Sequence, residues 1–143
     1  MTREDFLVYM DHFNNMRYDE LVKYFTDDIQ VKYFTDMKRG APRGDIADGP
    51  AAFVANYKQL HSTLIEKLEL GKYVATDENI FCELWTEFHF TKDNPDFSAG
   101  PMKKGDVFVC TNFVLYFLDE NGKFKEIHIA HHLVHPPSEA RLA

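Results

Sequence analysis

The sequence predicts an α+β fold, in which three N-terminal helices pack on one face of a curved, mostly antiparallel sheet. Helical spacing of apolar residues dominates the N-terminal part of the chain, and a single strand pattern, 28–35, interrupts it. From residue 63 onward the pattern alternates as it does in strands. The chain has 143 residues without a repeat or linker, so we expect one domain, residues 1–143.

The helical part contains three predicted helices, over 2–16, 18–26 and 50–62. Thr2 and Asp5 form a potential capping box at the first of them. Asp48-Gly49-Pro50 is a typical start for the third, because proline suits the first helical turn. The stretch 35–49 is rich in Gly, Pro and Asp, and we expect a loop that acts as a lid.

Four long strands are predicted over 63–76, 80–92, 106–118 and 125–134. A long connection separates the second from the third, and an Asn-Gly turn joins the third to the fourth. A curved sheet closed by helices forms a cone, so the pattern predicts a pocket inside it.

Charge and composition exclude several classes of protein. A net charge of −7 and a pI of about 5.4 argue against nucleic-acid binding. No apolar run approaches the roughly 20 residues of a membrane span, and the N-terminus lacks the features of a signal peptide. We therefore expect a cytoplasmic protein that associates with neither nucleic acid nor membrane, with Cys82 and Cys110 as buried thiols.

The stretch 127–135, "IHIAHHLVH", holds four of the seven histidines. On a helix they would share one face, but β-branched residues and the preceding Asn-Gly turn favour a strand. On a strand, His131 and His132 point to opposite faces. Histidines on the same face lie about 13 Å apart, too far to share a metal ion. We therefore predict no metal site, and His131, on the apolar face, is the candidate for the pocket.

The predicted strand 80–92 has two distinct faces. One carries apolar residues, including Ile80, Cys82 and Leu84, and we expect it to pack on a second subunit in a homodimer. The other carries Trp85, Glu87 and His89 and is either a solvated face or a pocket wall. The imidazole of a wall histidine would suit proton transfer near neutral pH.

The order of elements resembles the SnoaL-like branch of the NTF2-like superfamily, which includes polyketide cyclases, ketosteroid isomerases and scytalone dehydratases. "DHFNNMRYDELVKYFTDDIQVKY" (11–33) is similar to the opening of scytalone dehydratase and ends on Tyr33, the position of a tyrosine that holds a catalytic water. "DENIFCELWTEFH" (77–89) places His89 on a catalytic histidine of that family. "TNFVLY" places Asn112 on its substrate-binding asparagine.

The departures from that family are informative. Its Tyr-Asp pair falls on Phe13-Asn14 here, and its other active-site histidine falls on Leu68. We therefore expect a reaction related to scytalone dehydration but distinct from it. A looser alignment with SnoaL-type cyclases places His132, in place of His131, near the catalytic aspartate of those enzymes.

The resemblance and the residues together predict a cofactor-free acid/base enzyme, an isomerase, cyclase or dehydratase. Its substrate would be a ring-like carbonyl compound, typically a polyketide-type biosynthetic intermediate. The predicted catalytic residues are His89, His131, Tyr33 and Asn112, and the predicted substrate-binding residues are Trp85, Glu87, Phe53, Tyr57 and His61. One alternative is a non-catalytic ligand-binding or dimerisation module. Another is a hydrolase that uses Glu83, Glu87 or Glu126.

Overall fold

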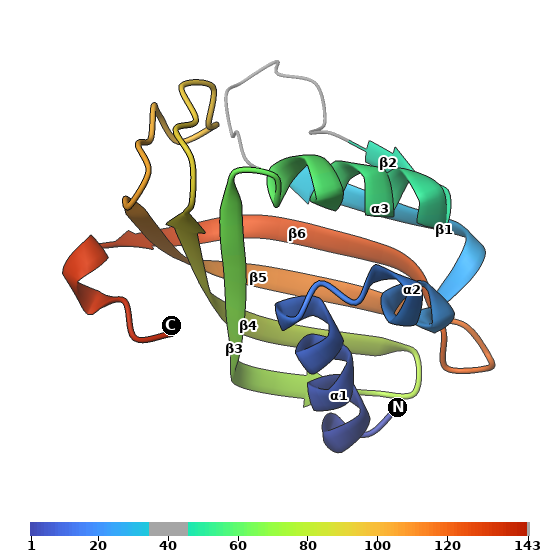
Figure 1. Ribbon diagram of the computed structural model, residues 1–143. Helices are drawn as coiled ribbons and strands as arrows, with labels where there is room; N and C mark the ends of the chain where they lie inside the picture. The colour runs from blue at the N-terminus through green and yellow to red at the C-terminus, as the bar shows by residue number, and fades with distance from the viewer. Residues whose placement is uncertain (35–45, 143) are drawn as a thin grey trace, which may run out of the picture.

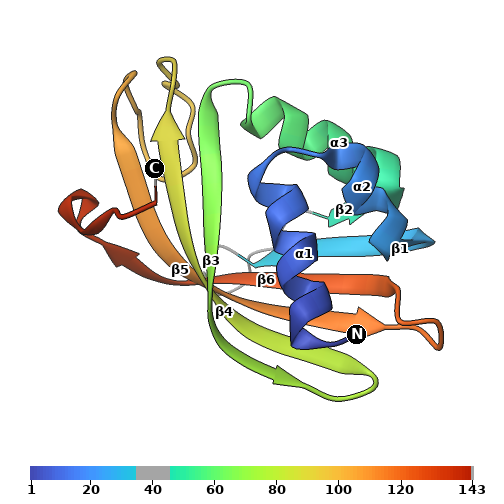
Figure 2. The ribbon, with the colours of Figure 1, turned by 60° about the horizontal axis from the view of Figure 1, so that its bottom comes forward.

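The computed structural model describes residues 1–34 and 46–142, which form a strongly curved six-stranded sheet with helices on its concave side (Figures 1 and 2). The α+β fold is therefore confirmed. The lid expected over 35–49 falls mostly outside the described residues. Its last residues form a short strand that the sequence did not predict and the start of a helix.

The strands follow the order β2-β1-β6-β5-β4-β3 across the sheet. Their bounds are β1 Phe25–Phe34, β2 Ile46–Asp48, β3 Leu64–Ala75, β4 Asn79–Phe90, β5 Val107–Leu118 and β6 Phe124–His135. The β1–β6 pair is parallel and the other described pairs are antiparallel. The parallel pair joins the first strand of the chain to the last, which brings N-terminal and C-terminal residues into one wall.

The helices are α1 Arg3–Asn14, α2 Tyr18–Leu21 and α3 Gly49–Leu60. The capping box at α1 is confirmed, because the Asp5 amide donates to the Thr2 hydroxyl and the Thr2 amide donates to the Asp5 carboxylate. α2 is shorter than predicted and continues as a 3₁₀ turn, η1 Val22–Tyr24. Phe25 already belongs to β1, where it pairs with Phe124 of β6, and its buried ring packs edge-on against Phe53 of α3 at 4.7 Å.

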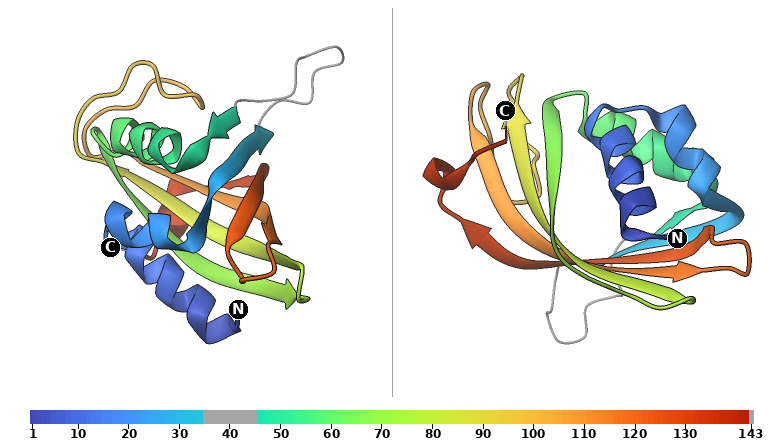
Figure 3. Two further views of the ribbon diagram at one scale, coloured as in Figure 1. Left: turned by 90° about the vertical axis from the view of Figure 1, so that its right-hand side faces the viewer. Right: turned by 90° about the horizontal axis from the view of Figure 1, so that it is seen from below.

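The core lies between the helices and the concave face of the sheet, around which the strands curve (Figure 3). From α1 it takes Phe6, Tyr9, Met10 and Phe13. From β4 it takes Ile80, Cys82 and Leu84. The expectation that this β4 face packs on a second subunit is wrong, because helices of the same chain cover it. Both cysteines are buried free thiols, as predicted.

After β6, a short 3₁₀ turn, η2 Pro137–Glu139, reverses the chain, and the C-terminal residues run back toward β3 and β4 (Figure 1). This tail covers part of the convex side of the sheet. No helix within the described residues is long and apolar enough to cross a membrane.

Candidate active site

A cavity of about 500 Å³ opens between α3, the concave face of the sheet and the connection between β4 and β5. Its size falls in the range of small-molecule sites, roughly 300–1,000 Å³. A second hollow of about 50 Å³ lies deeper in the cone. Four residues line both spaces: Tyr57, Glu66, Asn112 and Ile129. The outer wall is largely apolar and includes Leu60, Phe88, Phe97, Phe108 and Val134.

β4 presents to this cavity the face opposite to the predicted one. Thr86 lines the inner hollow and Phe88 lines the outer cavity. Because side chains alternate along a strand, Trp85, Glu87 and His89 belong to the convex face. The helices need a continuous apolar surface beneath them. Of the two faces of β4, only the one with Ile80, Cys82 and Leu84 offers such a surface.

The predicted convergence of His89 and His131 in one pocket is therefore wrong. Neither His89 nor Trp85 nor Glu87 lines the described cavity. The three residues form a separate cluster on the outside of the sheet. The error lies in which face of β4 was assigned to the inside of the cone. Since side chains alternate along a strand, one wrong residue places the whole face on the wrong side of the sheet.

Glu87 is the centre of that outer cluster. Its buried carboxylate accepts hydrogen bonds from Trp85 Nε1 at 2.7 Å and from the backbone amides of Arg141 at 2.8 Å and Leu142 at 3.0 Å. His89 Nε2 lies 2.8 Å from the same carboxylate. Burial raises the pKa of Glu87, but these hydrogen bonds outweigh it and hold the pKa below the usual range. The cluster fixes the C-terminal tail to the sheet.

The other two carboxylates considered for a hydrolase also lie outside the cavity. Glu126 forms an ion pair with Lys32 and lies 3.3 Å from His128 Nε2. Glu83 faces the backbone of Gly71 on the neighbouring strand. Neither carboxylate can reach a ligand in the cone.

The two adjacent histidines of β6 point to opposite sides of the sheet, and a β-bulge follows directly after the inward-pointing His131. Asn112 pairs with His131 and Thr111 pairs with Leu133, so His132 is the extra residue in the ladder. His131 lines the cavity, as predicted, at its solvent-exposed mouth. His132 stacks on Phe113 on the other side of the sheet, with ring centroids 4.2 Å apart. The four histidines of β6 therefore do not converge.

His131 belongs to a hydrogen-bonded chain that spans three strands. Its Nδ1 lies 2.5 Å from Oδ1 of Asn112, and Nδ2 of Asn112 donates to the Thr86 hydroxyl at 3.1 Å. Asn112 and Thr86 are both buried. With Nδ2 of Asn112 donating to Thr86, Oδ1 is the acceptor, and His131 Nδ1 carries the proton. Partial desolvation lowers the pKa of His131, so the neutral ring presents the lone pair of Nε2.

The tyrosines expected at the site come from β1, the strand beside β6, and from α3. Tyr33 of β1 and Tyr57 of α3 both line the cavity, and Asn56 donates to the Tyr33 hydroxyl at 3.2 Å. Burial, followed by the proximity of Tyr33, raises the pKa of Tyr57 well above its usual value. Tyr57 is thus a neutral phenol at physiological pH. Phe53 is a core residue that reaches only the inner hollow.

Glu66 of β3 is the functional candidate that the sequence reasoning missed. It is 6% exposed, lines both the cavity and the inner hollow, and lies among apolar side chains. Burial raises its pKa, although the neighbouring His61 opposes the shift. The signal was available in "LIEKLEL", where Glu66 shares the parity of the inward-facing Leu64 and Leu68.

His61 was expected to bind substrate, but its ring does not line the described cavity. The side chain is 2% exposed and lies behind Glu66, with Nε2 at 3.5 Å from Glu66 Oε1. Any effect of His61 on a bound ligand therefore passes through Glu66.

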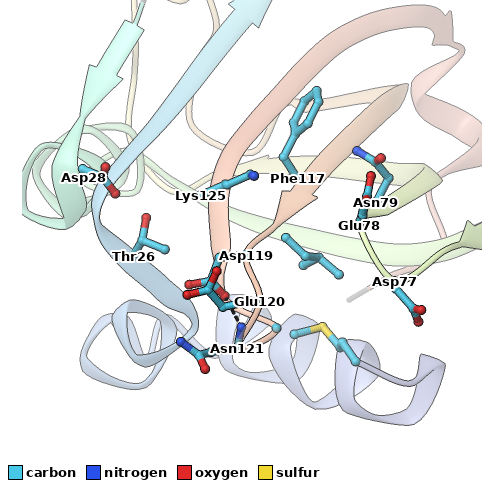
Figure 4. A pocket seen from close by; sticks show the side chains of 13 residues that line it. Thr26, Asp28, Asp77, Glu78, Asn79, Phe117, Asp119, Glu120, Asn121 and Lys125 are labelled. Carbon is cyan, nitrogen blue, oxygen red and sulfur yellow. Dashed lines mark hydrogen bonds between the residues drawn. The ribbon is translucent and has the colours of Figure 1, made fainter.

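A larger open hollow of about 1100 Å³ lies at the far end of the sheet, beside the β5–β6 turn. Figure 4 shows Asp28, Asp77, Glu78, Asp119 and Glu120 around it. Most of these carboxylates are exposed to water. Nowhere in residues 1–34 and 46–142 does a group of three or more His, Cys, Asp or Glu side chains assemble that could hold a metal ion. The cavity around Glu66 and His131 combines a largely apolar lining with the buried polar residues Glu66 and Asn112, so it is the candidate active site.

Comparison with known proteins found no matching family model and no matching curated protein. Solved structures do match. A SnoaL-like polyketide cyclase from Agrobacterium tumefaciens has a TM-score of 0.67 at 15% identity, over 89% of this chain and 87% of that one. An NTF2-like protein from Anabaena variabilis has a TM-score of 0.65 at 8% identity, over 91% and 85% of the two chains.

A third match is a Mycobacterium tuberculosis protein in complex with estradiol-17β-hemisuccinate. It has a TM-score of 0.64 at 10% identity and covers 85% of each chain. The fold of the present chain is therefore NTF2-like, the α+β cone that the sequence suggested. Its structural neighbours include SnoaL-like polyketide cyclases and a protein that binds a steroid derivative.

Proposed function

We propose that this protein is an acid/base enzyme that acts on an uncharged, ring-containing carbonyl compound held in the cone. The observation that carries the proposal is the buried Glu66 in an aromatic-walled cavity that also presents the His131–Asn112 pair. Titratable groups with perturbed pKa values in an apolar cavity are typical of catalytic sites. The proposed reaction is proton abstraction next to a carbonyl group, followed by isomerisation, ring closure or loss of water.

In this proposal His131 is the general base. Asn112 accepts the hydrogen bond from Nδ1, which leaves Nε2 as the basic atom at the cavity mouth. The lowered pKa of His131 keeps the ring unprotonated near neutral pH. Asn112 acts as a positioning residue, because its amide fixes the tautomer and orientation of the ring.

Glu66 is the proposed general acid. Its raised pKa favours the protonated carboxyl, which can donate to the carbonyl oxygen as negative charge develops there. Tyr33 and Tyr57 line the same cavity, and their phenols could donate to the same oxygen. The base and the proton donors thus come from four different elements: His131 from β6, Glu66 from β3, Tyr33 from β1 and Tyr57 from α3.

The lining indicates the charge of the substrate. None of the described lining residues is Lys or Arg, and the whole chain carries a net charge of −7. An anionic ligand would be desolvated without a counter-charge, which is costly. We therefore propose a neutral polyketide-type intermediate of natural-product biosynthesis, processed in the cytoplasm by the protein's own side chains without a cofactor.

Proton exchange provides a test that does not require the natural product. Cyclic ketones incubated with the protein in D₂O should gain deuterium next to the carbonyl, as measured by mass spectrometry. We expect E66Q and H131F to lose the catalysed exchange by roughly 10²-fold or more, the usual contribution of a general acid or base. A protein that binds these ketones without catalysing exchange would instead be a ligand-binding module.

The homodimer stays a prediction, but a dimer cannot use the face of β4 that the sequence suggested. The face expected to form it lies inside the cone, so a dimer through the sheet would use the convex face. Phe81 and Leu133 are 41% and 51% exposed. Light scattering on the purified protein distinguishes a dimer from a monomer.

A further inference from the structure

His61 connects the candidate active site to a second side chain that faces away from the cavity. The Tyr18 hydroxyl lies 2.6 Å from His61 Nδ1, and His61 Nε2 lies 3.5 Å from Glu66 Oε1. The two ring nitrogens of one buried imidazole therefore face a phenol on α2 and a carboxyl on β3. The ring is held by its neighbours, since Phe13 and Tyr57 pack against it at 5.7 and 5.6 Å between ring centroids.

Tyr18 lies at the solvent side of this arrangement. It lines a surface cleft of about 370 Å³ together with Arg17, Asp19, Glu20 and Lys58. Glu66, at the other end, lines the cavity. Tyr18, His61 and Glu66 thus form a line of polar side chains from surface water to the proposed general acid, through an otherwise aromatic part of the core.

We propose that Tyr18 and His61 form a hydrogen-bonded relay that controls the protonation of Glu66. Tyr18 is a positioning residue, which acts on Glu66 through His61 and does not contact substrate. The importance of the relay for catalysis rests on the proposed function, in which Glu66 is the acid. The relay itself is a property of the ligand-free protein.

The direction of the hydrogen bonds follows from the chemistry of Tyr18. Partial burial, together with the nearby Glu66, raises its pKa, so the phenol stays protonated and donates to His61 Nδ1. In its neutral form the imidazole then carries its proton on Nε2, which lies 3.5 Å from Glu66 Oε1, and neither atom has a hydrogen bond to another described residue. A hydrogen bond donated to the carboxylate favours the charged form and opposes the effect of burial. Burial and His61 thus act on the pKa of Glu66 in opposite directions, so the carboxyl can both hold and release a proton.

The titratable groups around Glu66 other than His61 are neutral near physiological pH. Tyr57 of α3 and Cys110 of β5 are both buried near Glu66, and burial raises the pKa of each. His131 of β6 lies on the wall of the same cavity, and its pKa is lowered. His61 is thus the neighbour of Glu66 that can carry a proton on either ring nitrogen. Its hydrogen bond with Tyr18 decides which nitrogen carries the proton.

Nuclear magnetic resonance on the ligand-free protein tests the relay. Nitrogen-15 shifts of His61 report its tautomer, and carbon-13 shifts of the Glu66 carboxyl report its titration, with H61Q and E66Q used to assign the signals. In Y18F we expect His61 to lose its preference for the Nε2–H tautomer. The pKa of Glu66 should then rise by roughly half a unit or more, because a donor to the carboxylate is weakened. Y73F is the matched control, since it removes a tyrosine hydroxyl outside the relay.

Two results would overturn the relay: a wild-type His61 with its proton on Nδ1, or a Glu66 that titrates at the same pH in wild type and Y18F. Either result would leave the proton-exchange test of the enzyme unaffected. Conversely, a confirmed relay in a protein that exchanges no ketone proton would reject the proposed enzyme and retain the relay. Y18F changes one partly exposed hydroxyl, so the test does not depend on a core substitution that unfolds the protein.

Discussion

Asn112 of β5 and His131 of β6 face each other across the ladder, with His131 Nδ1 at 2.5 Å from Asn112 Oδ1. His131 keeps the inward parity of Ile127 and Ile129, because the register with β5 is unbroken up to the Asn112–His131 pair and the bulge begins only at His132. Asn112 is in turn held by the buried Thr86 hydroxyl. The base of the proposed reaction is thus oriented by two buried polar residues on adjacent strands.

Replacing Asn112 by aspartate should raise the pKa of His131. A carboxylate beside Nδ1 stabilises the imidazolium, and an opposite charge at this distance typically shifts a pKa by about one unit or more. The base would then be protonated near neutral pH, so the ketone exchange rate should fall at pH 6 to 7 and recover at higher pH. An NMR titration of His131 measures the shift. N121D, which adds the same charge in the exposed β5–β6 turn, should leave the pKa of His131 unchanged.

Replacing Glu66 by glutamine should change how stability depends on pH. The folded pKa of Glu66 is raised, so its contribution to stability is fully present below the unfolded pKa and is lost as the pH rises through the folded pKa. E66Q stays neutral, and its free energy of unfolding relative to wild type should therefore improve as the pH rises from 4 to 9. Urea unfolding at several pH values measures the difference. The exposed E78Q serves as control, and a parallel pH dependence of E66Q and wild type would contradict the assignment.

The outer cluster around Glu87 makes a separate prediction about stability. R141P removes the backbone N–H that donates to the buried carboxylate, whereas R141A keeps it. A hydrogen bond to a charged group contributes about 1.5–3 kcal/mol. The guanidinium that R141A removes lies over Trp85 and pairs with exposed Glu69, contacts that contribute roughly 1 kcal/mol or less each. R141P should therefore destabilise the protein more than R141A does.

The pH dependence of that difference has a definite sign. The folded pKa of Glu87 is lowered, so its stabilising effect is present above the unfolded pKa of about 4.3 and declines as the pH falls through the folded value. Urea unfolding at pH 7 should separate R141P from R141A clearly, and the gap should narrow toward pH 3. Equal stabilities of the two variants at pH 7 would show that the tail does not hold Glu87.

The sequence predicted the fold class and most of the elements, because the periods of helix and strand are local properties. It also placed His131 correctly, since Ile127 and Ile129 share its apolar face. It failed on β4, where both faces are plausible on their own. The apolar set could cover a second subunit or lie beneath helices, and only the packing of α1 decides between them. The bulge at His132 likewise depends on cross-strand pairing, which no local pattern reveals.

Glu66 was overlooked for a different reason. In "LIEKLEL" it reads as one of two glutamates on a charged, half-exposed edge strand. Its burial depends on Tyr57 of α3 and on His61, the residue directly after that helix, and both precede the strand in the chain. Glu66 lies on the same face of the strand as Leu64 and Leu68, and this pattern could have indicated its burial. A charged residue on a buried face is a candidate for function.

The central claim is that the proton-transfer site lies inside the cone, at His131 and not at His89 or His132. Three alanine variants of these histidines, compared in the ketone exchange assay, test it directly. We expect H131A to lose roughly 10²-fold or more of the catalysed rate. H89A and H132A, which alter the convex face, should keep the rate within a small factor of wild type. Full activity in H131A together with loss in H89A would contradict the account and return the site to the outer face of β4.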